Sequence, residues 1–197
     1  MDKKIVAYDV TLRDGTQGEG VSFSVEDKVR VAHKIDELGV GYIEGGWPGS
    51  NERDEAFFNQ IKNEKFENAI ISAFGSTRRF SSNCDNDNNI QALLKAETKA
   101  ITIVGKTWDF HVKTALKIEN NENLELISDS VKYLSERTDE VFFDAEHFFD
   151  GFKDNPNYAV QTLKSALDAG AKWVVLCDTN GGSLPNEIRK IVEDVIN

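Results

Sequence analysis

The chain has 197 residues, of which 40% are hydrophobic and 29% are charged, and its formal net charge is −11. This composition excludes a disordered or fibrous protein and predicts one domain over residues 1–197 with a substantial core. The acidic balance argues against a nucleic-acid or anionic-membrane partner, because phosphate binding requires clustered cations.

The compartment is predicted from cysteine usage and from the first residues. Cys84 and Cys177 have no disulfide-framework or zinc-site spacing, and the N-terminal Met-Asp-Lys-Lys has no apolar segment for export. No stretch approaches the roughly 20 apolar residues of a membrane span. We therefore expect a cytoplasmic protein without a membrane partner.

Buried strands and amphipathic helices alternate along the chain. Short apolar runs predict strands over Ile5–Asp9, Gly41–Gly45, Ala69–Phe74, Ala100–Val104, Glu140–Asp144 and Trp173–Cys177. Apolar positions three or four residues apart predict helices over Val25–Leu38, Asp54–Ile61, Asn89–Ala96, Asn123–Glu136 and Asn157–Ala169, with another opening at Pro185. Ser24 is the predicted cap of the first helix, and Gly39 and Gly170 are predicted stops.

This rhythm predicts right-handed parallel crossovers, either in an α/β barrel or in a doubly wound sheet. The first strand is followed by neither a Gly-x-Gly-x-x-Gly sequence nor a phosphate-binding Walker loop, which weakens the doubly wound alternative. We therefore predict a (β/α)8 TIM barrel of which about six of eight units are present, since a complete barrel takes about 250 residues.

Polar residues follow the first predicted strand at the end where such barrels expose their chemistry. Arg13, Asp14 and Gln17 lie within Thr-Leu-Arg-Asp-Gly-Thr-Gln, ahead of the first helix. An isolated Arg-Asp dipeptide is more often a structural ion pair, but the longer string is specific.

The string Thr-Leu-Arg-Asp-Gly-x-Gln resembles the opening motif of a family of metal-dependent acyl-CoA condensing and cleaving enzymes. The family includes isopropylmalate, homocitrate and citramalate synthases and hydroxymethylglutaryl-CoA lyase. The resemblance implies that Arg13 stabilises a developing oxyanion, that Gln17 contacts substrate and that Asp14 binds a divalent ion, Mg²⁺, Mn²⁺ or Zn²⁺. It also implies a 2-oxo acid and acetyl-CoA as substrates.

The second strand leads into Ile-Glu-Gly-Gly-Trp-Pro-Gly-Ser-Asn, which resembles the citramalate branch, with pyruvate as acceptor. Within this string, Glu44 is either a second acid at the barrel mouth or the partner of a cation such as Arg13. After the third strand, Arg78 and Arg79 either receive a carboxylate or phosphate or form a solvated loop pair.

The later strand ends supply three more candidates. His111, a candidate substrate contact, follows the fourth strand in a region that matches the family only in part. Alternation along the fifth strand places Asp144 and Glu146 on one face, and the resemblance implies that Glu146 orders the oxo-acid site. Thr179, in Asp-Thr-Asn-Gly, would contact the substrate carboxylate, whereas we assign Cys177 to packing.

Family members carry a His-x-His metal motif that this sequence lacks. We therefore expect this chain to be a fragment that lacks the last barrel units and the accessory segments. We expect the fragment to be inactive alone and the full-length protein to be a homodimer. Three functions stay open: citramalate synthesis; isopropylmalate or homocitrate synthesis, or a related lyase or aldolase reaction; and a non-catalytic barrel-like module.

Overall fold

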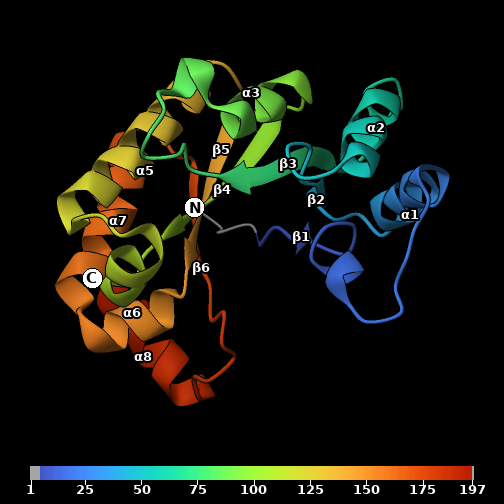
Figure 1. The fold of residues 1–197 in the computed structure, drawn as a ribbon. Coiled ribbons are helices and arrows are strands. Elements are labelled where there is room, and N and C mark those ends of the chain that lie inside the picture. The colour runs from blue at the N-terminus through green and yellow to red at the C-terminus, as the bar shows by residue number, and fades with distance from the viewer. Residues whose placement is uncertain (1–4, 197) are drawn as a thin grey trace.

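Six parallel strands follow one another in chain order across a single sheet in the computed structural model, which describes residues 5–196. The strands are β1 Tyr8–Asp9, β2 Tyr42–Gly46, β3 Ile70–Ser76, β4 Ala100–Lys106, β5 Glu140–Glu146 and β6 Trp173–Leu176. The sheet is curled, with helices along its outer side and with β1 and β6 at opposite ends (Figure 1). This is a partial (β/α)8 barrel, as predicted.

The long helices lie between the strands, close to the predicted positions. The long ones are α1 Val25–Glu37, α2 Glu52–Ile61, α3 Asn88–Lys95, α5 Asn120–Ser135, α7 Pro156–Asp168 and α8 Pro185–Ile196. Ser24 caps α1 in a reciprocal capping box with Asp27, and Gly39 and Gly170 have positive φ values of 78° and 107° after their helices. None of the described helices is both long and apolar enough to cross a membrane.

Several short helical segments were not predicted: α4 Asp109–His111, α6 Phe148–Asp154, the 3₁₀ turns η1 Gly15–Gln17 and η2 Cys84–Asn86, and the π-helical turn η3 Val112–Leu116. The α6 helix has no side-chain cap and starts after His147 in a left-handed conformation with φ of 55°. Because it is seven residues long and contains Gly151, it carries little of the periodic signal that identifies a helix in a sequence.

The first predicted strand is wrong over its apolar part. The strand covers Tyr8–Asp9 alone, and Ile5 is 94% exposed. Its ladder with β2 ends where the amides of Gly41 and Tyr42 donate to the carbonyl of Ala7, at 3.0 and 3.2 Å. Residues before Ala7 have no β2 residue to pair with, so an apolar run alone does not make them a strand.

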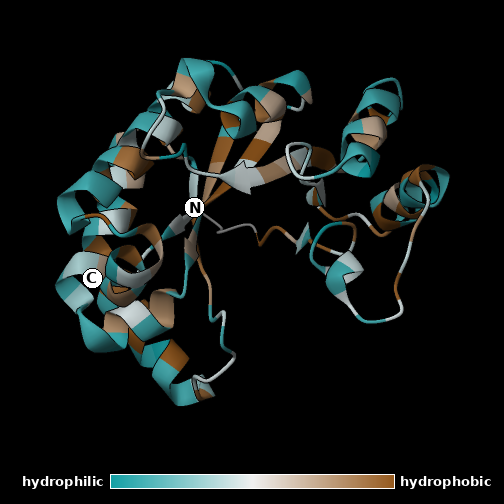
Figure 2. Ribbon diagram, viewed as in Figure 1, coloured by the Kyte–Doolittle hydropathy of each residue, from teal (hydrophilic) through white to brown (hydrophobic). Residues whose placement is uncertain are grey.

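The two faces of the sheet differ in chemistry. On the outer face, Ile43, Ile101 and Phe143 are almost fully buried in one core with residues of the surrounding helices, such as Phe57 and Ile127. Hydrophobic residues dominate β3, β4 and β5, while the helices are hydrophilic over much of their surface (Figure 2).

The inner face has an aromatic layer at the amino-terminal end of the strands. The ring of Tyr42 stacks on Tyr8 at 5.8 Å and meets Phe142 edge-on at 4.9 Å, and Trp173 stacks on Phe142 at 5.8 Å. This layer lies at the amino-terminal end of the sheet, so the polar residues Glu44, Asp144 and Glu146 lie beyond it, toward the carboxyl ends.

Candidate active site

A cavity of about 960 Å³ lies over the carboxyl ends of the strands. Loops after β1, β2, β3 and β6 and the last residues of β4 and β5 contribute to its lining. Five predicted site residues lie on it together: Arg13, Asp14, Gln17, Glu146 and Thr179. Ligand sites of parallel α/β sheets occur at this end of the strands, so the cavity is the candidate active site.

The loop after β1 folds tightly enough to aim Arg13 at this cavity. The carboxylate of Asp9 accepts from the amide and the hydroxyl of Thr11, at 2.9 and 3.1 Å. The amides of Arg13 and Gly15 both donate to the carbonyl of Val10, at 3.2 and 3.1 Å. These local bonds form a turn directly after the strand.

The guanidinium of Arg13 is held by two carboxylates and an aromatic ring. Its Nε donates to Oε1 of Glu44 at 2.5 Å, its Nη1 donates to Oδ1 of Asp14 at 2.8 Å, and it lies 4.0 Å above the ring of Phe74. Of the two interpretations of Glu44, the structure shows the ion pair. Burial raises the pKa of Glu44, and the positive charge of Arg13 opposes that rise.

The loop after β2 is built around a buried ion pair. Nζ of Lys28 donates to Oδ1 of Asp54 at 2.6 Å, and Oδ2 of Asp54 accepts from the amide of Trp47 at 2.9 Å. Gly46 has a φ of 151°, and a Cβ there would lie 2.7 Å from the carboxyl carbon of Asp54. A glycine is therefore required for this loop to close and to bring Trp47 to the cavity wall.

Glu146 lies on the same face of β5 as Asp144, as the strand alternation predicted, and both line the cavity. Nζ of Lys106, which is opposite Glu146 in register on β4, donates to Oε2 of Glu146. Sequence reasoning missed Lys106. The available signal was its place at the carboxyl end of a buried strand.

The side chain of Asp144 has no hydrogen bond among the described residues, although the charges of Glu44 and Arg13 act on it. Burial raises its pKa to about 7, the negative charge of Glu44 adds to the rise, and the positive charge of Arg13 opposes it. The cavity therefore contains a carboxyl group that titrates near neutral pH.

Thr179 and Cys177 enter the cavity from the end of β6. The hydroxyl oxygen of Thr179 accepts from the amide of His147 at 2.9 Å, which leaves the hydroxyl hydrogen available to a ligand. Burial raises the pKa of Cys177 to about 12, and nearby carboxylates, Asp144 first, add to the rise. A thiol of that pKa is a poor nucleophile. The structure places Cys177 on the cavity wall, so its assignment to packing stays a prediction.

Two predicted site residues, Glu44 and His111, are not part of the cavity lining, and only Glu44 pairs with Arg13 on the cavity wall. His111 packs against Trp108 at 4.8 Å and His147 at 4.6 Å between ring centroids. Burial lowers its pKa, and His147 and Lys106 lower it further. Its contact with substrate stays a prediction.

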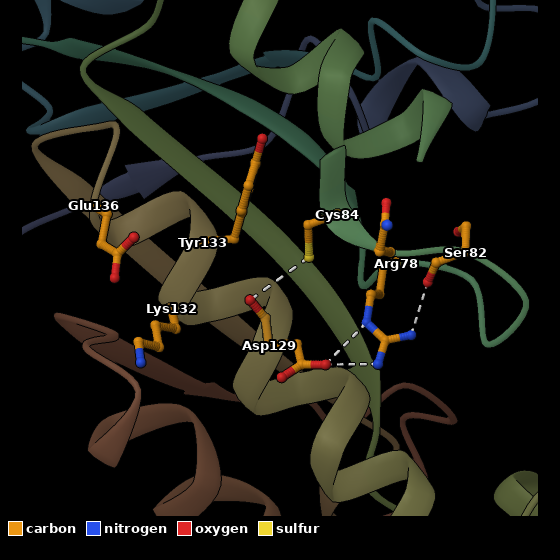
Figure 3. A pocket seen from close by; sticks show the side chains of 8 residues that line it. Arg78, Ser82, Cys84, Asp129, Lys132, Tyr133 and Glu136 are labelled. Carbon is orange, nitrogen blue, oxygen red and sulfur yellow. Dashed lines mark hydrogen bonds and ion pairs between the residues drawn. The ribbon is translucent and has the colours of Figure 1, made fainter. Parts of the chain in front are cut away.

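Arg78 and Arg79 both reach the cavity wall, but Arg78 is already paired. Its guanidinium points into a second hollow of about 380 Å³ beside α5, where Nε and Nη2 donate to Oδ2 of Asp129 at 3.2 and 2.6 Å (Figure 3). Its Nη1 donates to the carbonyl of Ser82 at 2.9 Å. The pairing makes Arg78 a link between the β3 loop and α5.

The described residues do not form a metal centre by themselves. Across residues 5–196, no group of three or more His, Cys, Asp or Glu side chains could hold a metal ion. The side chain of Asp14 is 57% exposed at the cavity, and one of its oxygens accepts from Arg13. Asp14 therefore offers a single hard ligand, where Mg²⁺ and similar ions need several.

Known proteins resemble the chain over nearly its whole length. It is 61% identical over 188 residues to an (R)-citramalate synthase from Geobacter sulfurreducens, and 56% identical over 195 residues to one from Aquifex aeolicus. It is 31% identical over 197 residues to 2-isopropylmalate synthase 1 from Caldanaerobacter subterraneus. The first two alignments cover 95% and 99% of this chain, but 36% and 37% of the relatives, so the chain spans about a third of their length. The third covers 99% of this chain and 47% of that relative.

Solved structures show the same fold at lower identity. The hydroxymethylglutaryl-CoA lyase from Pseudomonas aeruginosa superposes with a TM-score of 0.77 at 20% identity, covering 98% of this chain and 64% of that one. An HMG-CoA lyase from Acinetobacter baumannii, in complex with coenzyme A and 3-methylmalate, gives 0.77 at 17% identity, covering 97% and 62%. The sequence matches the HMGL-like family over residues 4–197, and the chain belongs to that family.

Proposed function

We propose that this chain is part of an acyltransferase that condenses acetyl-CoA with pyruvate to give citramalate and CoA. The observation that carries the proposal is the difference in identity along nearly the whole chain. Five (R)-citramalate synthases are 46–61% identical to it, whereas three 2-isopropylmalate synthases are 30–31% identical.

The geometry of Arg13 supports a role at the oxygen that becomes negative during condensation. Nε and Nη1 are engaged by Glu44 and Asp14, and within residues 5–196 Nη2 makes no hydrogen bond. The guanidinium is thus fixed in orientation while donors remain for a ligand in the cavity. Charge stabilisation by a preorganised donor is commonly a large contribution to catalysis.

Glu146 and Thr179 support a second contact region across the cavity. We propose that Thr179 donates its free hydroxyl hydrogen to the carboxylate of the oxo acid, and that Glu146, held by Lys106, orders the bound acid. Gln17, which is exposed on the cavity rim, is proposed as a further substrate contact.

The family resemblance implies a divalent cation, which would supply Lewis-acid polarisation of the ketone of the oxo acid when bound. Because the described residues do not complete a metal site, we propose only that Asp14 supplies one ligand and that the others come from the rest of a longer protein. From the family resemblance we also propose that residues 1–197 belong to one barrel domain. We propose further that the longer protein is a cytoplasmic homodimer.

The test is CoA release by the full-length protein with pyruvate, 2-oxoisovalerate and 2-oxoglutarate at equal concentrations. We expect kcat/KM to be at least about tenfold higher with pyruvate, a discrimination that pocket shape alone can supply. A preference for 2-oxoisovalerate or 2-oxoglutarate would replace the proposal by an isopropylmalate- or homocitrate-type reaction. No release with any of the three, with or without Mn²⁺, would favour a non-catalytic module.

A further inference from the structure

A chain of hydroxyl groups runs across the inner face of the sheet and ends on the carboxylate that holds Arg13. The hydroxyl of Tyr8 lies 2.7 Å from Oε2 of Glu44 and 2.6 Å from Oγ1 of Thr102. Oγ1 of Thr102 lies 2.9 Å from Oγ of Ser72. These residues come from four neighbouring strands, so this row of hydrogen bonds exists only when the sheet is formed.

The hydroxyl hydrogens of Tyr8, Thr102 and Ser72 have one arrangement that is consistent with these distances. An ionised carboxylate only accepts, so Tyr8 must donate its single hydroxyl hydrogen to Glu44. Thr102 must then donate to Tyr8, and Ser72 to Thr102. Burial strongly raises the pKa of Tyr8, and the negative charge of Glu44 raises it further, so the phenol keeps its hydrogen. Each hydroxyl dipole therefore points toward Glu44.

Both oxygens of Glu44 are consequently occupied, Oε1 by Arg13 and Oε2 by Tyr8. Glu44 is 1% exposed and Thr102 and Ser72 are completely buried, while Tyr8 is partly buried, so the carboxylate has little access to water that could replace a missing donor. Loss of the Tyr8 hydroxyl would leave Oε2 without a donor and free the carboxylate to rotate.

We propose that Tyr8 is a positioning residue, which orients Arg13 toward the cavity by fixing the carboxylate of Glu44. The catalytic role of Arg13 in this inference rests on the proposed function, whereas the hydrogen bonds from Tyr8 to Glu44 and from Arg13 to Glu44 do not depend on it. Tyr8 is not among the residues that line the cavity. Its effect on turnover must pass through Glu44 and Arg13.

Tyr42 provides a matched control for a substitution of Tyr8. Tyr42 stacks on Tyr8, and its hydroxyl also donates to a glutamate, at 2.6 Å to Oε2 of Glu140. That glutamate is at the opposite end of the strands from Arg13 and pairs with Lys172. Tyr42→Phe therefore removes a hydroxyl–carboxylate bond from the same aromatic layer without affecting the support of Arg13.

The first test measures kcat and KM of the full-length Tyr8→Phe and Tyr42→Phe variants with the oxo acid that the wild type accepts best. We expect Tyr8→Phe to lower kcat about tenfold, as for a lost hydrogen bond to a charged group, with KM changed by less than about twofold. Tyr42→Phe should have most of the wild-type kcat. Equal kcat values for the two variants would overturn the proposal.

The second test needs no turnover. Phenylglyoxal modifies free guanidinium groups, and peptide mass spectrometry gives its rate at Arg13 relative to Arg30, whose side chain is 78% exposed. We expect Tyr8→Phe to raise this ratio at least about threefold, because a guanidinium whose ion pair is weakened is freer to react. An unchanged ratio, or an equal rise in Tyr42→Phe, would overturn the proposal. If the wild type releases no CoA with any oxo acid, the proposed function fails, and this ratio alone decides the positioning of Arg13.

Discussion

Phe143 and Asp144 are neighbours in β5 but face opposite sides of the sheet, and they illustrate how the two faces differ. Phe143 is completely buried against the outer helices. Asp144 faces the cavity with a pKa raised to about 7, next to Glu44 and Arg13. Because side chains alternate along a strand, one segment supplies stability on one face and chemistry on the other.

The difference teaches that substitutions on the two faces should affect different measured quantities. The outer face has close-packed hydrocarbon, which contributes free energy by leaving water. The inner face places carboxylates close together in a partly buried cavity, which costs stability unless cations and donors compensate. The predictions below test this contrast, starting from the largest effect.

On the outer face, Phe143→Ala should destabilise the chain by about 3–5 kcal/mol, as for other buried phenylalanines, because it leaves a cavity beside Gly105. Urea unfolding measures this loss. The matched control is Phe110→Ala, whose side chain is 51% exposed and should lose less than about 1 kcal/mol. Similar losses for the two variants would contradict the packing described for β5.

On the inner face, Arg13→Lys should lower kcat of the full-length protein by about 10²–10³, since an ammonium lacks the planar fork with which the guanidinium meets Glu44 and Asp14 while its remaining donors keep a fixed direction toward the ligand. Unfolding free energy should change much less than in Phe143→Ala, because the charge is retained. Arg30→Lys, on the exposed surface of α1, is the control and should be fully active. A turnover of Arg13→Lys within threefold of wild type would remove Arg13 from the proposed mechanism.

The smallest effect concerns pH. The pKa of Asp144 rises from 3.8 to about 7 on folding, so the folded state binds more protons than the unfolded state between these values. The unfolding free energy must therefore fall as pH rises through that window, and the loss is complete above it. The stability of Asp144→Asn relative to wild type should rise by about 2 kcal/mol from pH 4 to pH 8, after discounting for partial exposure.

Urea unfolding of both proteins at several pH values checks this difference, with the exposed Asp168→Asn as the control. Other titrating groups cancel in the comparison with wild type. A difference that is constant with pH, or that changes in the opposite direction, would show that burial does not raise the pKa of Asp144.

Much of the fold follows from local patterns. Apolar runs predicted all six strands to within a few residues except at β1, and the caps at Ser24, Gly39 and Gly170 followed from residue type. Strand-end positions predicted that Arg13 and Glu146 would face one cavity. These features could be predicted because each depends on residues close together in the sequence.

The amino-acid sequence by itself therefore determined the alternation of strands and helices, the polar strand ends and the resemblance to a family. The tertiary structure alone decided the partners: Glu44 for Arg13, 31 residues away, Lys106 for Glu146, 40 residues away, and Thr102 for Tyr8, 94 residues away. It also left His111 outside the cavity and β1 short. The physical reason is that these contacts depend on which strands become neighbours and how the sheet curls, and pairing across strands has no periodic signature within either segment.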